Sequence, residues 1–187
     1  MIKRAFDIVV SIILLFVLIV PLALIALLVK ATSAGPAIHW SRRVGLKNNL
    51  FLMPKFRSMF IHAPQIATHL ISDSENFITP VGRVLRKTSL DELPQLFSVL
   101  RGDMSLVGPR PALFNQDDLI ALRTKYGVEK LRPGVTGWAQ VNGRDELPIA
   151  QKVEYDREYL EKGDLLLDFK ILVLTVFRVL QSKGIKH

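Results

Sequence analysis

The N-terminal part of the chain carries a long apolar segment. Ile8 to Val29 contains no charged residue, and a run of about 18 or more apolar residues is typical of a membrane-embedded helix. Lys3 and Arg4 precede the run, as in a cleaved signal peptide. The run is long for such a peptide, however, and only a weak small-residue cleavage pattern follows it. We therefore predict that the segment is retained.

A proline divides this apolar segment. Pro21 removes a helical hydrogen bond and clashes with the preceding turn. The part from Ile8 to Pro21 would be about 20 Å long as a helix, shorter than the roughly 30 Å hydrocarbon core. Cations flank both ends of the segment, at Lys3, Arg4, Lys30, Arg42, Arg43 and Lys47. A re-entrant helix–break–helix would keep both ends on the cytoplasmic side. A spanning helix with a proline kink is the alternative.

Beyond the apolar segment, the pattern predicts a mixed α/β domain that is predominantly helical. Short apolar stretches separated by Gly45 and Asn48 predict a hairpin of strands near 38–44 and 50–56. A further short strand is expected around 138–141, within a Gly-rich loop. Longer helices are expected over 112–127, 148–163 and 164–181, the last of them amphipathic and able to lie in the membrane interface or in the core.

Two further helices are predicted from their N-terminal signals. Thr79 can cap a helix that begins at Pro80. Pro94 is tolerated only near a helix start, which predicts an N-cap at or just before Leu93 and a helix that stops at Gly102. This places the adjacent acids of "SLDELPQLF", Asp91 and Glu92, at the mouth of the second helix.

Length and composition narrow the function classes. The 187 residues are enough for a single compact domain with a real core, and we divide them into a membrane segment, 1–30, and the domain that follows it, 31–187. The chain has no cysteine, which excludes disulfides, thiolate nucleophiles and cysteine-based zinc sites. Its net charge of +8 favours anionic partners such as phosphorylated metabolites, nucleic acid or a membrane surface.

The two adjacent acids are the candidate site of chemistry. Carboxylates are hard oxygen ligands that Mg²⁺ accepts together with water and substrate phosphates, so Asp91 and Glu92 are candidate metal ligands. Arg86 and Arg110 could neutralise phosphoryl oxygens, and an ionised Asp91 could act as a nucleophile in phosphoryl transfer. From the residues alone, Asp91 as a helix cap and Arg86 as a solvated helix charge stay open as structural alternatives, and each is strong when the residue is taken by itself.

The motifs that surround these acids resemble the bacterial sugar transferase family, the monotopic polyprenyl-phosphate phosphoglycosyl transferases. The resemblance covers most of the chain in the family's order, through the segments "KRAFDI", "KFRSM", "RKTSLDELPQLFSVLRGDMSLVGPRP", "RPGVTGWAQVNGR" and "LLDFKI". Larger members carry an additional N-terminal membrane domain, so this chain resembles the small catalytic-core members.

The resemblance implies an activity and a location. Members transfer sugar-1-phosphate from a UDP-sugar to a polyprenyl phosphate such as undecaprenyl phosphate and release UMP, with Mg²⁺ as cofactor. The implied partners are the UDP-sugar, the polyprenyl phosphate and membrane lipids, and not nucleic acid; the oligomeric state is not defined. The re-entrant helix, broken at Pro21, places the catalytic domain on the cytoplasmic face of the bacterial inner membrane. The family often has Ser-Pro at the break, whereas Val20 precedes Pro21 here.

The resemblance also assigns roles to residues. Asp91 is expected to be the nucleophile that forms a covalent phosphosugar intermediate, and Glu92 to help hold Mg²⁺. Residues expected near the substrate phosphates are Lys55, Arg86, Arg110 and Asp168. The tetrapeptide "DELP" recurs at 145–148, but this copy lacks the basic helix before it and the "GPRP" after it, so we expect only the first copy to be reactive.

Two other readings stay open. A membrane-anchored module that binds anionic lipid or nucleic acid would need no Mg²⁺ and would release no nucleotide. An aspartyl-phosphate hydrolase would use water, and not a polyprenyl phosphate, as the acceptor.

Overall fold

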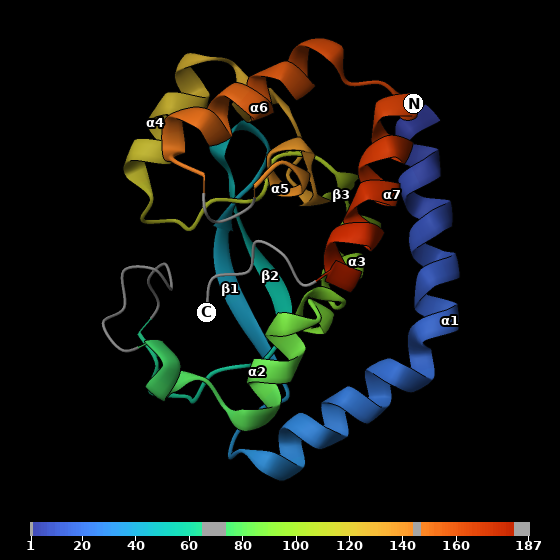
Figure 1. The fold of residues 1–187 in the computed structure, drawn as a ribbon, viewed down its shortest axis with the longest axis vertical. Helices are drawn as coiled ribbons and strands as arrows, with labels where there is room; N and C mark the ends of the chain where they lie inside the picture. Colours follow the sequence, from blue (N-terminus) through green and yellow to red (C-terminus); the bar gives the residue numbers. More distant parts are fainter. Residues whose placement is uncertain (1, 65–73, 144–146, 182–187) are drawn as a thin grey trace.

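The computed structural model describes residues 2–64, 74–143 and 147–181, which form a mostly helical domain with two small β-sheets (Figure 1). The α-helices are α1 (Ile2–Thr32), α2 (Pro80–Lys87), α3 (Gln95–Arg101), α4 (Asp117–Lys125), α5 (Trp138–Val141), α6 (Ile149–Lys162) and α7 (Leu165–Gln181). The strands are β1 (Ile38–Val44), β2 (Leu50–Phe56), β3 (Ser105–Val107) and β4 (Gly134–Thr136). Short 3₁₀ turns are η1 (Leu46–Asn48), η3 (Ser74–Phe77), η4 (Leu90–Glu92) and η5 (Val128–Lys130).

Helix α1 contains the predicted apolar segment. Within the described part of the chain it is the one helix long and apolar enough to cross a membrane. Pro21 lies inside it, and the ribbon of α1 changes direction part-way along (Figure 1). Most of its apolar side chains are exposed, among them Phe16 at 80% and Val20 at 64%. These side chains require an apolar surrounding other than the protein's own core.

The first turns of α1 are attached to the rest of the domain by polar contacts. Lys3 pairs with Asp168 of α7, and Arg4 donates hydrogen bonds to carbonyl oxygens at the end of α3, that of Val99 among them at 2.6 Å. Asp7, which is 2% exposed, accepts a hydrogen bond from the Ser105 hydroxyl at 2.8 Å and one from a β3 backbone N–H. The N-terminal end of the apolar helix is therefore held against the domain.

The last turn of α1 is attached to the same domain. Arg57, directly after β2, is 5% exposed. Its guanidinium donates to the carbonyl oxygen of Ala34 and to both the carbonyl and the hydroxyl oxygen of Ser33, the last two at 2.8 Å. Nearby, Ile25 and Val29 of α1 pack in a core cluster with Phe56 and Leu85. Both ends of the apolar helix are thus fastened to one body.

The predicted hairpin is confirmed. Strands β1 and β2 pair antiparallel with Ile38 opposite Phe56 and Val44 opposite Leu50. The turn between them uses positive φ angles at Lys47 and Asn48, where asparagine is one of the tolerated residues. Arg43 of β1 and Lys55 of β2 therefore lie on paired strands.

The helices on either side of the acids begin close to the predicted positions. Thr79 caps α2 by accepting a hydrogen bond from the Gly82 N–H at 2.9 Å, as predicted. The N-cap of α3 is Pro94, however, and not a residue at or before Leu93. Pro94 adopts helical angles, and a separate 3₁₀ turn, η4, occupies the preceding residues. Gly102 ends α3 with φ 94°, as predicted.

The strand predicted around Trp138–Val141 is wrong. Those residues form helix α5, and the strand β4 lies just before it at Gly134–Thr136, parallel to β3. Residues 134–137 include two glycines and two β-branched residues, and β-branched residues favour strands. The helix expected over 112–127 is also shorter, at Asp117–Lys125.

The central core joins α1, β2, α3, β3, α5, α6 and α7. Its buried residues are Met53, Leu96, Val99, Met104, Leu106, Val107, Val141, Tyr159 and Ile171. Helix α7 buries Asp168 and Ile171 on one face and exposes apolar residues elsewhere, Leu166 at 78% and Phe169 at 60%. It lies beside the first half of α1 in Figure 1.

We predict that Asp7→Ala destabilises the fold. The change leaves the Leu106 N–H and the Ser105 hydroxyl buried without this acceptor, which should lower the free energy of unfolding by about 1–3 kcal/mol. Denaturation of the detergent-solubilised protein measures it. Asp117→Ala, at an exposed position, should change it by about 0.5 kcal/mol or less. Equal effects at both positions would refute a structural role for Asp7.

Candidate functional site

The two predicted catalytic acids lie in the 3₁₀ turn η4, between α2 and α3. Ser89 opens the turn with φ 57°, a left-handed conformation that few residues other than glycine adopt. Asp91 is only 8% exposed, and the Glu92 side chain is 12% exposed. The direction of both carboxylates is therefore set by this turn and not by the first turn of α3.

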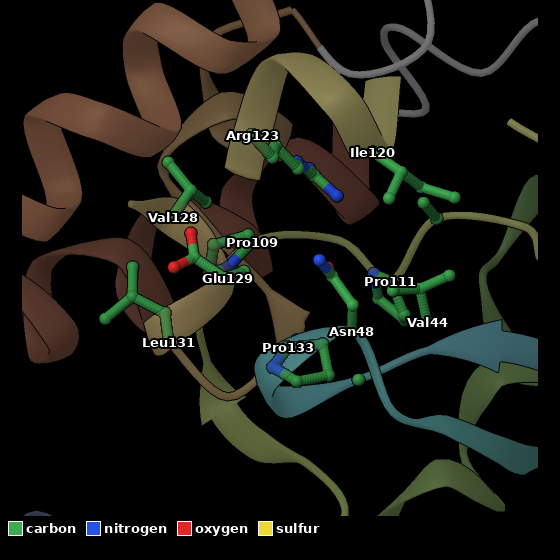
Figure 2. A pocket seen from close by; sticks show the side chains of 12 residues that line it. Val44, Asn48, Pro109, Pro111, Ile120, Arg123, Val128, Glu129, Leu131 and Pro133 are labelled. Atoms are coloured by element: carbon green, nitrogen blue, oxygen red, sulfur yellow. The ribbon is translucent and has the colours of Figure 1, made fainter. Parts of the chain in front are cut away.

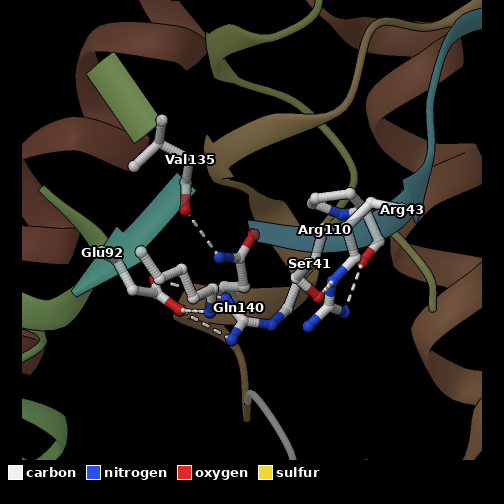
Figure 3. A network of polar contacts seen from close by, with 8 residues as sticks. Ser41, Arg43, Glu92, Arg110, Val135 and Gln140 are labelled. Carbon is white, nitrogen blue, oxygen red and sulfur yellow. Dashed lines mark hydrogen bonds and ion pairs between the residues drawn. The ribbon is translucent and has the colours of Figure 1, made fainter. Parts of the chain in front are cut away.

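Glu92 is held between two cations from distant parts of the chain. Lys55 of β2 donates to Glu92 Oε1 at 2.8 Å. The Arg110 guanidinium donates to the same oxygen at 2.8 Å and to Oε2 at 3.4 Å (Figure 3). The structure thus brings together three residues that the sequence analysis assigned to one site from two separate segments, Lys55 from "KFRSM" and the other two from the segment that ends in "GPRP".

This pairing keeps Glu92 ionised. Burial favours the protonated carboxyl, but the charges of Arg110 and Lys55, together with their hydrogen bonds, hold the pKa of Glu92 well below its usual range. Burial in turn lowers the pKa of Lys55, and the charge of Glu92 opposes this effect. The three groups form a network in which the carboxylate compensates both cations.

The pKa of Asp91 is shifted in the opposite direction from that of Glu92. Burial raises its pKa to about 6, against the opposing charges of Lys55, Arg86 and Arg110 and with the support of the Glu92 charge. An Asp carboxyl titrates ordinarily near 3.9. The pair therefore combines a permanently charged acid, Glu92, with one that gains its charge near neutrality, as in sites where two acids have different roles. Arg86 of α2 also acts on this site, because its charge lowers the pKa of Asp91.

Backbone carbonyl groups in and next to the "GPRP" segment, which carries Arg110, accept hydrogen bonds from neighbouring segments. The Pro109 carbonyl accepts from the Gly134 N–H at 2.9 Å, the Pro111 carbonyl from Arg43 at 3.2 Å and the Ala112 carbonyl from the Val44 N–H at 3.0 Å. A Cβ at Gly134 would lie 2.1 Å from the Gly108 nitrogen, so only glycine permits this approach. The Gly-rich loop before α5 therefore packs directly beneath the segment that presents Arg110.

The site contains polar residues that the sequence analysis did not assign to it. Arg43 of β1 donates through Nε to Ser41 at 3.0 Å, and Gln140 of α5 is 8% exposed and donates to the Val135 carbonyl at 3.0 Å (Figure 3). Arg43 had been counted only as a cation flanking the membrane segment. Because alternate residues of a strand share a face, the spacing of Ser41 and Arg43 could have shown that they point the same way.

Two small cavities flank the "GPRP" segment. One of about 30 Å³ is lined by Pro109, Pro111, Arg123, Glu129 and other residues (Figure 2), and has room for a water molecule or two. A tighter one lies between Arg43, Met53, Lys55, Gln95, Arg110 and Pro111. Neither of these two cavities is large enough to hold a sugar nucleotide.

Asp168 is not brought into this cluster. It is 1% exposed, pairs with Lys3 and accepts a hydrogen bond from the Tyr159 hydroxyl at 2.6 Å. These contacts join α7, α1 and α6. Its expected contact with substrate phosphates stays a prediction, and its contacts here are structural. The second "DELP" copy begins at Asp145, which lies outside the described residues.

A family model covers nearly the whole chain, including every member of the cluster. The model is described as bacterial sugar transferase, and it matches residues 1–182. The chain belongs to the bacterial sugar transferase family. The predicted resemblance is confirmed, and two of its motif segments meet in the Lys55, Glu92 and Arg110 network.

Curated relatives are identical to this family member at about two fifths of the aligned residues. The UDP-glucose:undecaprenyl-phosphate glucose-1-phosphate transferase of Escherichia coli (strain K12) is 40% identical over 98% of this chain and 41% of its own length. The undecaprenyl-phosphate galactose phosphotransferase of Salmonella typhimurium is 40% identical over 97% and 41%. The sugar transferase EpsL of Bacillus subtilis (strain 168) is 40% identical over 99% and 90%. The chain spans about two fifths of the length of the first two relatives.

The residues of this cluster match Mg²⁺ in ligand chemistry, whereas the positive charge around them opposes its binding. Asp91 and Glu92 supply the hard oxygens that Mg²⁺ prefers, and the described residues contain no group of three or more metal-ligating side chains. Arg43, Lys55 and Arg110 line one cavity, and two of them bind Glu92. Cations around a carboxylate disfavour a further cation. An Mg²⁺ ion therefore fits here when phosphate oxygens and water complete its ligands.

We predict that Asp91 titrates with a midpoint near 6. The carboxyl carbon signal of ¹³C-labelled aspartate, assigned through its loss in Asp91→Asn, should move between pH 5 and 7. Since the folded-state pKa exceeds the unfolded-state value, the folded protein binds more protons between these values, and this group alone lowers stability as pH rises through 4–6. An Asp91 midpoint below 4.5 would contradict the assigned burial effect.

Proposed function

We propose that the protein transfers sugar-1-phosphate from a UDP-sugar to a polyprenyl phosphate, such as undecaprenyl phosphate, and releases UMP. One observation carries the proposal: a buried carboxyl with a pKa near 6, Asp91, stands beside a carboxylate that binds two cations. A nucleophile needs to be available in its charged form near neutral pH. Anionic phosphates need cations that are already positioned. The cluster supplies both.

In the first half-reaction an Asp91 carboxylate oxygen attacks the phosphorus that carries the sugar. A bond forms between this oxygen and the phosphorus, and the bond from the phosphorus to the bridging oxygen of the diphosphate breaks. UMP leaves with the bridging oxygen, and an aspartyl-phosphosugar remains on the enzyme. Arg86, Lys55 and Arg110 stabilise the charge on the phosphoryl oxygens, Arg110 with a planar fork that suits phosphate.

In the second half-reaction a phosphate oxygen of the polyprenyl phosphate attacks the same phosphorus. The bond to Asp91 breaks, the carboxylate is regenerated, and the product is a polyprenyl diphosphate sugar. Because both phosphates use the same cations in turn, the reaction follows a ping-pong order. Lys55 and Arg110 would have to exchange part of their contact with Glu92 for a contact with substrate, since both bind that carboxylate in the structure.

Mg²⁺ is the proposed cofactor, with Asp91 and Glu92 as its protein ligands. When bound, it would neutralise charge on the diphosphate of the donor. Asp91 and Glu92 would share it with phosphate oxygens and water. We therefore expect the ion to bind tightly only together with the nucleotide sugar.

We further propose that α1 is re-entrant and that the catalytic domain lies on the cytoplasmic face of the bacterial inner membrane. The support is that both ends of the apolar helix are fastened to one body, through Asp7 and Arg57 among others, with Pro21 between them. A helix that crossed the bilayer would separate its ends by the roughly 30 Å core. The exposed apolar face of α7, with Leu166 and Phe169, is proposed to lie in the same interface.

The sugar is not identified by the relatives. Two relatives of equal identity to this chain carry names that specify glucose and galactose. We therefore propose a hexose-1-phosphate donor class bound as a UDP-sugar, and expect the specificity to come from residues outside the shared cluster.

We predict that Asp91→Asn removes the covalent half-reaction. Wild-type protein given UDP-sugar and Mg²⁺ without acceptor should release up to one equivalent of UMP and gain the mass of a phosphosugar. Asp91→Asn, which is nearly isosteric, should show neither event. Asp145→Asn makes the same chemical change in the second "DELP" and should show both. UMP assay and intact-protein mass spectrometry measure the two events.

The same experiment separates the alternatives. Full turnover by Asp91→Asn would refute the nucleophile assignment. UMP release only when polyprenyl phosphate is present would indicate direct transfer in a ternary complex. Continuous UMP release without acceptor would indicate a hydrolase, and no release with any UDP-sugar would favour a binding module.

We predict that both ends of α1 face the cytoplasm. Cysteines can be placed singly at exposed Ile2 and Ala31, because the chain has none of its own. An impermeant thiol reagent should label neither in intact spheroplasts and both after lysis. Labelling of only one position in intact spheroplasts would indicate a spanning helix. Pro21→Leu should shift the segment toward spanning, since it restores the missing hydrogen bond.

A further inference from the structure

Arg123 of α4 forms a hydrogen bond with the backbone carbonyl of Arg110. Its Nη1 donates to the Arg110 carbonyl oxygen at 2.8 Å. The residues on either side of Arg110 are prolines, which have no N–H to donate. Carbonyl groups are therefore the main backbone contacts available in "GPRP". Arg123 is the contact closest to the Cα from which the Arg110 guanidinium extends.

Asp156 of α6 binds a second edge of the Arg123 guanidinium. Arg123 Nε and Nη2 donate to Asp156 Oδ2 at 2.9 and 2.6 Å. The side chains are 11% and 2% exposed, so water competes little for these contacts. One planar group thus joins α6, α4 and the Arg110 backbone, and Figure 2 shows Arg123 over the cavity that Pro109 and Pro111 line.

We propose that Arg123, oriented by Asp156, is a positioning residue for the transfer reaction: it fixes the backbone of Arg110 so that the Arg110 guanidinium reaches Glu92 and the substrate phosphate. The inference rests on the proposed function, because it assigns Arg123 a role through Arg110. Arg123 contacts Asp156 and the Arg110 carbonyl, so it acts through Arg110 and is not itself a catalytic residue.

The guanidinium is required for its shape and not only for its charge. Two of its nitrogens face Asp156 while a third faces the Arg110 carbonyl. A lysine ammonium is a compact charge without this fixed fork. Lysine can keep the ion pair or reach the carbonyl but cannot hold both in the same geometry. Because Arg110 binds Glu92 with a fork of its own, a shift of its backbone would misalign two contacts together.

The test is a double-mutant cycle between Arg123→Lys and Arg110→Lys, measured as the single-turnover rate of UMP release. Arg123→Lys alone should lower this rate about ten- to a hundred-fold, the scale expected for a small misplacement of a positioned group. In the Arg110→Lys background the same change should lower it less than about two-fold, because the group to be positioned has already lost its fork. Arg157→Lys, one residue from Asp156 in an exposed pair with Glu161, should leave the rate unchanged.

A second variant covers the case in which Arg123→Lys does not fold. Replacing both members of a buried ion pair by apolar residues of similar size is often neutral for stability. The double variant Arg123→Met/Asp156→Leu should therefore melt near the wild-type temperature but release UMP about ten-fold or more slowly. A folded double variant with the wild-type rate would overturn the proposal. Equal losses from Arg123→Lys in both Arg110 backgrounds would also overturn it, since they would indicate general destabilisation.

Failure of the transferase proposal can be distinguished from failure of the positioning role of Arg123. If wild-type protein releases no UMP from any UDP-sugar, the transferase proposal fails, and the cycle is then read from the binding of inorganic diphosphate with Mg²⁺ by calorimetry. Weaker diphosphate binding in Arg123→Lys that disappears in the Arg110→Lys background would still support positioning. Unchanged diphosphate binding in Arg123→Lys, beside weakened binding in Arg110→Lys, would refute it.

Discussion

The ionised carboxylate of Glu92 is the contact on which the candidate site depends. It joins β2, the η4 turn and the "GPRP" segment by binding Lys55 and Arg110 at once. Buried cations are costly unless they are paired, so the Glu92 carboxylate offsets the cost of burying the Lys55 ammonium and part of the Arg110 guanidinium. The same contact keeps the two cations close enough to act on one phosphate. Stability and the proposed chemistry therefore use the same three side chains.

This arrangement gives the adjacent acids Asp91 and Glu92 different pKa shifts. Glu92 takes up the nearby positive charge through direct contacts, while Asp91 is buried and feels those cations only at longer range. Burial consequently outweighs attraction for Asp91 and raises its pKa to about 6. A residue in a 3₁₀ turn opened by the left-handed Ser89 cannot easily turn away from this environment. The backbone thus helps to maintain the difference between the two acids.

A second constraint is that the apolar helix is fastened at both ends. Polar contacts inside a domain become stronger where water is excluded, and those of Asp7 and Arg57 are buried. They oppose any movement that would draw one end of α1 across a bilayer. Between them the helix exposes most of its apolar side chains, which need lipid or another apolar partner. The geometry of the membrane segment and the stability of the domain are therefore linked.

The sequence by itself determined the local features. The apolar run around Pro21, the 38–56 hairpin, the Thr79 cap and the Gly102 stop depend on residues close in the chain, and each lies where its pattern indicated. The motif resemblance also identified Lys55, Glu92 and Arg110 as one site.

Only the tertiary structure decided the rest, because it depends on contacts between distant residues. Glu92 binds two cations, Arg123 holds the Arg110 backbone, and Asp168 binds Lys3 and Tyr159 away from the cluster. None of these pairings has a sequence period or spacing that could reveal it. The strand expected at 138–141 lies just before those residues, at Gly134–Thr136, where it pairs with the distant strand β3. Burial, which sets the pKa of Asp91, likewise exists only in the folded chain.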